Sequence, residues 1–135
     1  MLFLLDTNAV SDAMKEHPRI KARLAALDPA DGAITCTVVV GEILFGIERL
    51  PAGKRREELH EKALRVLALL PCEPVAEAAA GHYSAVKRVC RPQSGALDDN
   101  DLWIAATALA LGATLVTRDD DFGLVPGLSV EDWTV

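Results

Sequence analysis

The 135-residue sequence lacks the cysteine and histidine patterns of several common classes of protein. Its cysteines, Cys36, Cys72 and Cys90, are widely spaced and form no Cys-x-x-Cys pair, which argues against a zinc ribbon and a disulfide framework. Its three histidines form neither a His-x-x-x-His nor a His-Glu-x-x-His motif, so a histidine-based metal site is not expected. We expect all three thiols to pack in the interior as small apolar groups.

The sequence also lacks a recognisable targeting or membrane-spanning segment. Its first residues carry no basic group, and the apolar run over residues 2–5 is too short for a signal peptide. The longest stretch without charge, residues 102–117, has 16 residues, is interrupted by Gly112 and is too short to span a membrane. We therefore expect a soluble, cytoplasmic protein without membrane contact.

Basic residues are scarce in the last third of the chain. The sequence has 20 acidic and 14 basic side chains, for a net charge of −6. Residues 1–95 hold 12 acidic and 13 basic side chains, whereas residues 96–135 hold eight acidic side chains and a single basic one, Arg118. A net negative charge argues against binding nucleic acid through charge alone. Because the excess is confined to the last 40 residues, it requires a local explanation.

The chain does have the hydrophobic content of one folded domain. Half of its residues are hydrophobic, which is too many for a disordered chain, and its length suits a single domain over residues 1–135. Helical and strand patterns alternate along it without an internal repeat. The expected strands cover residues 2–5, 33–36, 72–75, 114–117 and 128–130. The expected helices cover a segment that begins after residue 7 or 8 and runs to about 16, residues 19–27, 37–50, 54–70 and 76–91, and a segment that begins after residue 98 or 99 and runs to 111.

This alternation predicts an α/β fold with a parallel sheet and helices on both faces. Thr7 or Asn8 can cap the first helix, and Asp98 or Asp99 can cap the last. Residues 92–95 are typical of a loop. In folds of this kind, ligands bind beyond the carboxyl ends of the strands.

Five acidic residues lie where a solvated surface does not explain them: Asp6, Glu42, Asp101, Asp119 and Asp121. Each has an alternative structural interpretation. Asp6 could cap a helix, Asp101 could complement a helix dipole, Glu42 could pair with a basic residue, and residues 119–121 could form a polar turn. We favour a shared site because four separate segments bring acids to the same predicted sheet edge.

Such a cluster is unfavourable without a cation, because two unit charges 4 Å apart repel by about 4 kcal/mol at an effective dielectric of about 20. Ligands that are all oxygen atoms suit Mg²⁺ or Mn²⁺. A metal held by carboxylates can activate water and stabilise a phosphoryl oxyanion, so the expected chemistry is phosphodiester hydrolysis. Thr7, Asn8 and Thr117 neighbour these acids and could orient the ligands.

At these positions the chain resembles the PIN-domain ribonucleases, specifically the VapC-type toxins of bacterial toxin–antitoxin pairs. The matching segments are residues 4–8, 42–46, 100–108, 115–122 and 125–133. They span essentially the whole chain, and their order is more specific than any single motif. The resemblance implies a PIN-like three-layer fold with a parallel sheet of about five strands.

The resemblance also implies the roles of individual residues. It assigns Asp6, Glu42, Asp101 and Asp119 to the catalytic metal site, with Asp121 as the alternative to Asp119. Asp98 and Asp99 precede the matched position and are expected to cap a helix or to face solvent.

The implied activity is Mg²⁺- or Mn²⁺-dependent cleavage of RNA by an endoribonuclease. The implied assembly is a homodimer inhibited by a small antitoxin that binds DNA. Basic residues would then meet the RNA phosphates, and the candidates are Arg118, Arg55 and Arg88, the latter two within basic groups on predicted helices.

Two other hypotheses remain open. A receiver-type signalling domain would share the length and the acidic pocket, but it requires an aspartate after a middle strand and a lysine after a late strand. Residues 72–75 contain no aspartate, and the last third of the chain has no lysine. A catalytically silent PIN-like binding module would be favoured by the loss of one of the four acids, and all four are present.

Overall fold

The centre of the protein is a sheet of five parallel strands in the order β3-β2-β1-β4-β5. The structure is a computed structural model that describes residues 1–90 and 96–135. The strands are β1 (Leu2–Leu5), β2 (Gly32–Cys36), β3 (Cys72–Glu73), β4 (Thr114–Val116) and β5 (Val130–Glu131). The parallel sheet of about five strands is therefore confirmed.

The middle strands are the ones with continuous apolar sequence. Phe3, Leu4 and Leu5 of β1 are buried, and so are Leu115 and Val116 of β4. A parallel strand covered by helices on both faces has no solvent-facing side, so it has no alternation of polar and apolar residues. The edge strands β3 and β5 have only two residues each. The strand β3 is shorter than the prediction over residues 72–75, and β5 is offset from the prediction over residues 128–130. An edge strand pairs with only one neighbour, so its apolar pattern is weaker and its bounds are harder to predict.

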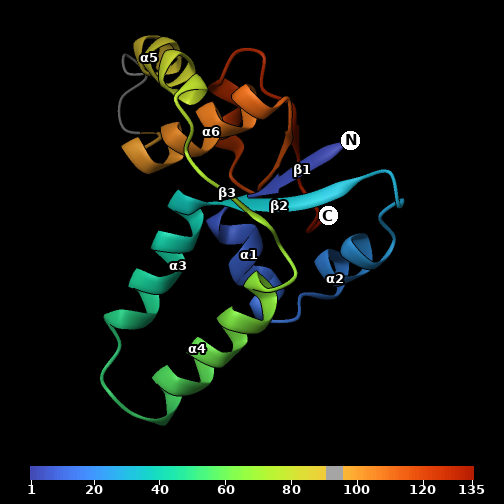
Figure 1. Cartoon of the computed structure of the whole chain (residues 1–135), viewed down its shortest axis with the longest axis vertical. Helices are drawn as coiled ribbons and strands as arrows, with labels where there is room; N and C mark the ends of the chain where they lie inside the picture. Colours follow the sequence, from blue (N-terminus) through green and yellow to red (C-terminus); the bar gives the residue numbers. More distant parts are fainter. Residues whose placement is uncertain (91–95) are drawn as a thin grey trace.

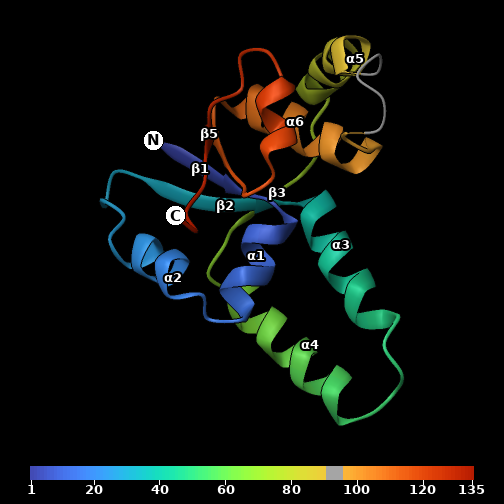
Figure 2. The same cartoon turned by 180° about the vertical axis from the view of Figure 1, so that it is seen from behind.

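Helices cover both faces of the sheet, as predicted (Figures 1 and 2). The helices α5 (Ala78–Cys90) and α6 (Asp99–Leu111) lie together on one face. On the other lie α1 (Thr7–Met14), α2 (Pro18–Ala25), α3 (Thr37–Glu48) and α4 (Lys54–Leu67).

Some helix ends differ from the predictions. The first helix ends at Met14 instead of Glu16, because Glu16 adopts a left-handed conformation with φ 58°. His17 then caps the next helix, which has Pro18 in its first turn, a position that needs no N–H donor.

The strand order creates a topological switch point between β1 and β4. From β1 the chain moves outward through β2 to β3, and it later returns to the other side of β1 with β4 and β5. The carboxyl ends of β1 and β4 therefore open onto the crevice in which α/β proteins bind ligands. Asp6 follows β1 and Thr117 follows β4 at this point.

Other predictions can be compared with the described residues. Cys36 and Cys90 are buried, but Cys72 is exposed on the edge strand β3, so the expectation that all three thiols are packed is wrong. The predicted loop over residues 92–95 and the predicted helix end at Arg91 lie outside the described residues. No helix within residues 1–90 and 96–135 has the length and apolar character needed to cross a membrane.

A cluster around Trp133 holds the C-terminal segment against the sheet and α2. The indole is buried and contacts Phe3 of β1, with ring centroids 5.2 Å apart. Its N–H donates to Glu131 at 3.0 Å. Arg23 of α2 forms an ion pair with Glu131 at 2.7 Å, and its guanidinium lies 4.9 Å from the indole centroid.

This cluster gives a prediction for stability. Trp133→Ala should lower the free energy of unfolding by about 3–5 kcal/mol, because it leaves a cavity beside Phe3 of β1. Urea unfolding followed by far-ultraviolet circular dichroism measures the change without relying on tryptophan fluorescence. Val135→Ala is the matched control, because Val135 is 84% exposed and should contribute little. A loss below about 1 kcal/mol for Trp133→Ala would contradict the assigned role.

Candidate functional site

Asp6 has a structural role as well as a place at the switch point. Its backbone N–H donates to the carbonyl of Val116 at 3.1 Å, which continues the pairing of β1 with β4. Its carboxylate accepts a hydrogen bond from the Ala9 N–H at 2.8 Å and caps α1. The prediction that Thr7 or Asn8 caps this helix is therefore wrong: Asp6 has the extended backbone of a cap, and Thr7 is already helical.

The carboxyl group of Asp6 is buried among polar neighbours. Burial raises its pKa from the ordinary value of 3.8 to about 6. Hydrogen bonds from the Thr117 hydroxyl and the Ala9 N–H oppose that pKa shift, the negative charge of Asp119 adds to it, and the positive charge of Arg118 opposes it. The pKa of Asp6, at the end of β1, thus depends on three residues that follow β4: Thr117, Arg118 and Asp119.

Asp119 is positioned by the turn that follows β4. Its N–H donates to the Thr117 hydroxyl at 3.0 Å, and its carboxylate accepts from the Asp121 N–H at 2.9 Å. Asp119 thereby caps the short 3₁₀-helix η2 (Asp120–Leu124). Asp119 is partly buried and its charge acts on Asp6, whereas Asp121 is exposed.

Glu42 joins three helices at the same edge. Its carboxylate accepts from the Thr7 hydroxyl of α1 at 2.5 Å and from the Asn100 amide of α6 at 3.3 Å. Both partners are neutral, so these contacts do not support the alternative of pairing with a basic residue. Asn8 lies in the first turn of α1 and is partly buried.

Asp101 lies in the first turn of α6 and forms a capping box with Asp98. The Asp98 carboxylate accepts from the Asp101 N–H at 2.8 Å, and the Asp101 carboxylate accepts from the Asp98 N–H at 3.3 Å. Asp98 is the cap that the sequence allowed. Burial, then the negative charges of Asp98 and Glu42, raise the pKa of Asp101 to about 7.

The edge therefore holds two electrostatically linked pairs of acids, Asp6 with Asp119 and Glu42 with Asp101. Thr7 follows Asp6 and donates to Glu42, so it joins the two pairs. This oxygen-only donor set, with its pKa values raised by burial and like charge, fits a hard divalent cation.

The acids do not form a closed ligand cage. Across residues 1–90 and 96–135, no three acidic, histidine or cysteine side chains are close enough to hold a metal ion together. Mg²⁺ usually retains several waters and binds through one or two carboxylates, so either pair could provide its protein ligands.

Another acid of the last third joins two helices rather than facing only solvent. The Asp99 carboxylate accepts from the Tyr83 hydroxyl at 2.9 Å and from the Lys87 ammonium at 3.0 Å, which links α6 to α5. The Tyr83 ring stacks on Trp103, with centroids 3.9 Å apart.

The three candidate RNA contacts lie in different places. Arg118 follows β4 and forms an ion pair with Asp12 of α1 at 3.0 Å. Arg55 is exposed in the first turn of α4, at the end of the α3–α4 pair that is remote from the sheet (Figure 1). Arg88 is exposed in the last turn of α5.

Sequence reasoning missed the contacts of Asn100 and Asp12. The only signal for Asn100 was its place at the start of the matched segment over residues 100–108, beside Asp101. The partner of Asp12 lies 106 positions away and had no signal in the sequence.

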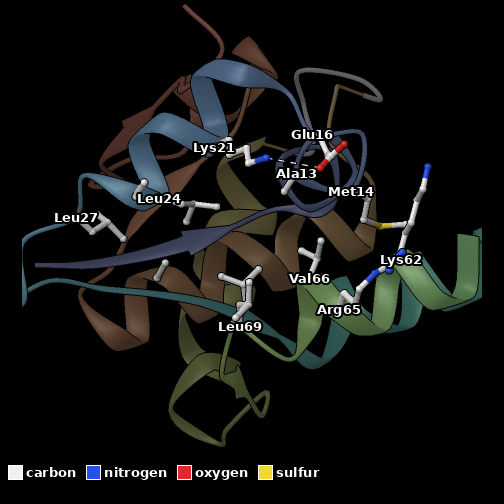
Figure 3. A pocket seen from close by; sticks show the side chains of 13 residues that line it. Ala13, Met14, Glu16, Lys21, Leu24, Leu27, Lys62, Arg65, Val66 and Leu69 are labelled. Atoms are coloured by element: carbon white, nitrogen blue, oxygen red, sulfur yellow. Dashed lines mark ion pairs between the residues drawn. The ribbon is translucent and has the colours of Figure 1, made fainter.

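A separate groove lies between α1, α2 and α4 near the start of β2 (Figure 3). It is a cavity of about 780 Å³, with apolar side chains from all three helices, such as Met14, Leu24 and Val66, and from Leu69 in the turn after α4. Lys62 and Arg65 of α4 add positive charge to its lining, while Lys21 forms an ion pair with Glu16 at 3.6 Å. It lies toward the amino ends of the strands, away from the acidic edge.

The fold and the site together define a small α/β domain with a carboxylate cluster at a topological switch point. The family model for the PIN domain matches residues 3–128, and the chain belongs to the PIN-domain family. The chain is 32% identical to Ribonuclease VapC1 of Haemophilus influenzae (strain R2866), with 99% of both chains covered.

Solved structures show the same fold. The structure of VapBC2 from Rickettsia felis bound to a DNA fragment from their promoter matches with a TM-score of 0.88 and 26% identity, covering 98% of this chain and 99% of the other. VapBC-5 from Mycobacterium tuberculosis, a member of the VapBC family of toxin–antitoxin systems, matches with a TM-score of 0.72 and 26% identity, covering 99% and 98%. The resemblance to the PIN domain is confirmed, and the receiver alternative fails because receivers have the strand order 2-1-3-4-5.

The buried carboxyl of Asp6 gives a prediction for pH dependence. Because its pKa is higher in the folded protein than its ordinary 3.8, its protonated form stabilises the fold below about pH 4. That stability is lost as the pH rises through about 6. Asp6→Asn keeps a capping side chain and removes the charge. At pH 8, but not at pH 4, the variant should exceed the metal-free wild type in unfolding free energy by on the order of 2 kcal/mol.

Urea unfolding in EDTA at the two pH values tests this expectation. Asp120→Asn controls for the change in net charge, because Asp120 is exposed in the 3₁₀-helix η2 that follows Asp119. An equal destabilisation of Asp6→Asn at both pH values would show that the buried charge does not limit stability.

Proposed function

We propose that this protein is a metal-dependent endoribonuclease that acts as the toxin of a toxin–antitoxin pair. The proposal is supported above all by two electrostatically linked pairs of acids, Asp6 with Asp119 and Glu42 with Asp101, near the switch point of a PIN domain. The similarity to a relative named as a ribonuclease supports RNA as the substrate. The catalytically silent alternative predicts RNA binding without cleavage.

In this proposal, the four acids hold Mg²⁺ or Mn²⁺ through one or both pairs, with Asp121 as the alternative to Asp119. A bound divalent ion would activate water for attack on a phosphodiester and stabilise the oxyanion that develops. The chain's own residues prepare the site. Thr7 and Asn100 donate to Glu42 and fix its carboxylate, and Thr117 donates to Asp6 while it accepts from the Asp119 backbone.

The protonation of the acids follows from their surroundings. Without a cation, burial and like charge keep the pKa of Asp6 near 6 and that of Asp101 near 7. Both must lose their protons to act as ligands, so protons compete with the metal below neutral pH. RNA cleavage should therefore increase from pH 5.5 to pH 8.

The proposal predicts that purified protein cuts single-stranded RNA with Mg²⁺ or Mn²⁺ and stops when EDTA is added. Asp6→Asn and Asp101→Asn should each reduce the cleavage rate by more than about 100-fold. Loss of a group that only orients a metal ligand reduces activity by about 10- to 100-fold, and loss of a ligand itself should cost more. A gel assay with end-labelled RNA measures the rate. Circular dichroism checks that both variants fold, and Asp28→Asn, an exposed aspartate in the turn before β2, serves as the matched control.

Unchanged cleavage by both variants would contradict the site. Wild-type protein that binds RNA but leaves it intact with either metal would support the silent binding module. In a second readout, Mn²⁺ should raise the melting temperature of the wild type more at pH 8 than at pH 5.5, and Asp6→Asn should weaken this effect.

We also propose that a small DNA-binding antitoxin binds and inhibits this protein. The similar structures of VapBC2 with promoter DNA and of a member of the VapBC toxin–antitoxin family support such a partner. The groove between α1, α2 and α4 supports a place for it (Figure 3). Its apolar lining with Lys62 and Arg65 suits an amphipathic helix with acidic flanks, one of the common modes of helix recognition.

The groove gives a prediction about this partner. Leu69→Asp should weaken the complex with the antitoxin encoded beside this gene by at least about tenfold, because it places a charge against an apolar helix face. Isothermal titration calorimetry measures the affinity, and RNA cleavage by the free variant should be unchanged. Leu64→Asp, near the end of α4, is the matched control, because Leu64 is exposed but does not line the groove. Equal affinities for Leu69→Asp and the wild type would exclude this groove.

A further inference from the structure

Arg118 is the one basic side chain in residues 96–135, and it lies between two residues of the acidic edge, Thr117 and Asp119. Its side chain does not extend freely into solvent. Its Nε–H donates to the carboxylate of Asp12 at 3.0 Å, across from the end of β4 to the second turn of α1.

Asp12 is an unusual partner for a surface arginine. The residue is 8% exposed, whereas the side chain of Arg118 is about half exposed. A buried carboxylate needs a charged or hydrogen-bonding partner, and Arg118 supplies one. The carboxylate of this ion pair is therefore buried, and its guanidinium is partly exposed to solvent.

The geometry leaves part of the guanidinium available. Arg118 donates to Asp12 through its Nε–H, which leaves the four N–H groups on its two terminal nitrogens. The positive charge of Arg118 also acts on Asp6, so the guanidinium lies within electrostatic reach of the acidic edge. An exposed cation beside this edge is placed to meet a phosphate of an RNA bound there.

We propose that Arg118 binds an RNA phosphate beside the acidic edge and that Asp12 is the residue that positions it. The inference rests on the proposed function for the identity of the substrate, and it assigns a role to Asp12, which touches neither RNA nor metal. A guanidinium matches a phosphate with two parallel hydrogen bonds, which a lysine cannot reproduce. An arginine already held by a buried carboxylate loses less side-chain entropy when it binds than a free surface arginine.

The position of Asp12 allows a test based on the direction of the effect. Asp12→Asn removes a negative charge near the RNA, so simple electrostatics predicts tighter RNA binding. If Asp12 positions Arg118, the same change should weaken binding. The two explanations predict opposite signs.

The experiment measures the affinity for a fluorescein-labelled single-stranded RNA by anisotropy in EDTA, which prevents metal-dependent cleavage, over a range of salt concentrations. Arg118→Gln should raise the Kd about tenfold and reduce the slope of log Kd against log salt by about 0.7, the value for one lost phosphate contact on a single strand. Asp12→Asn should raise the Kd by about three- to tenfold. In the Arg118→Gln background, Asp12→Asn should have no further effect.

Three further measurements separate positioning from a purely structural role. Arg118→Lys keeps the charge but not the paired hydrogen bonds, so it should keep the wild-type salt slope and still bind RNA more weakly than the wild type, and its exposed site should tolerate the change. With Mg²⁺, Asp12→Asn should raise KM and leave kcat within about twofold. Arg19→Gln is the matched control for the loss of one arginine, because Arg19 is exposed at the start of α2, beyond the far end of α1.

Several results would overturn the inference. Unchanged or tighter RNA binding by Asp12→Asn contradicts positioning, and so does an effect of Asp12→Asn that persists in the Arg118→Gln background. If the wild type cuts RNA but Asp12→Asn binds it normally, this inference fails and the proposed function stands. If the wild type binds RNA without cutting it, the proposed function fails and the Kd values still decide the role of Asp12. Wild-type protein that binds no RNA in EDTA contradicts this inference, and wild-type protein that also cuts no RNA with Mg²⁺ or Mn²⁺ contradicts both.

Discussion

Negative charge gathered at the switch point is the constraint on which the rest of this structure depends. Burial and neighbouring acids raise the pKa of both Asp6 and Asp101 in the absence of a cation. These groups therefore ionise less readily in the free protein than an ordinary aspartate does, and a bound cation would oppose that shift in pKa. The net charge of −6 first argued against a nucleic-acid partner. Two acids of the last third, Asp101 and Asp119, instead lie with Asp6 and Glu42 at the switch point, where a metal, and through it a phosphate, could be held.

The acids of the edge are also parts of the fold. Asp6 caps α1, Asp119 caps η2, and Asp101 completes a capping box with Asp98. The structural and chemical interpretations weighed for these residues are therefore compatible, because one carboxylate can have an oxygen on a backbone N–H and another facing the crevice. This arrangement fixes each carboxyl group on a rigid helix terminus, which suits a site that must hold its ligands in place.

The sequence was sufficient to predict the parallel sheet, the two helical layers and the segments that bear the acids, because buried runs such as residues 2–5 and 114–117 have no other stable position. It misplaced the first helix cap, since Asp6, Thr7 and Asn8 are all good capping residues and only the backbone decides among them. It placed the edge strands approximately, and it judged Cys72 by the average burial of cysteine although this residue lies at an open edge. The contacts between Asn100 and Glu42 and between Arg118 and Asp12 join distant segments, and no local pattern encodes them.

The pairing of β4 with β1 has a consequence for the synthesis of the protein. Asp6 is made long before β4, which begins at Thr114 and completes its surroundings, and Asp119 lies beyond β4. A domain generally folds as a unit. The acidic edge is therefore incomplete until synthesis has passed Asp119. A chain that stops before Asp119 lacks a member of at least one of the two acid pairs, so any activity of this edge would begin only once Asp119 has been made.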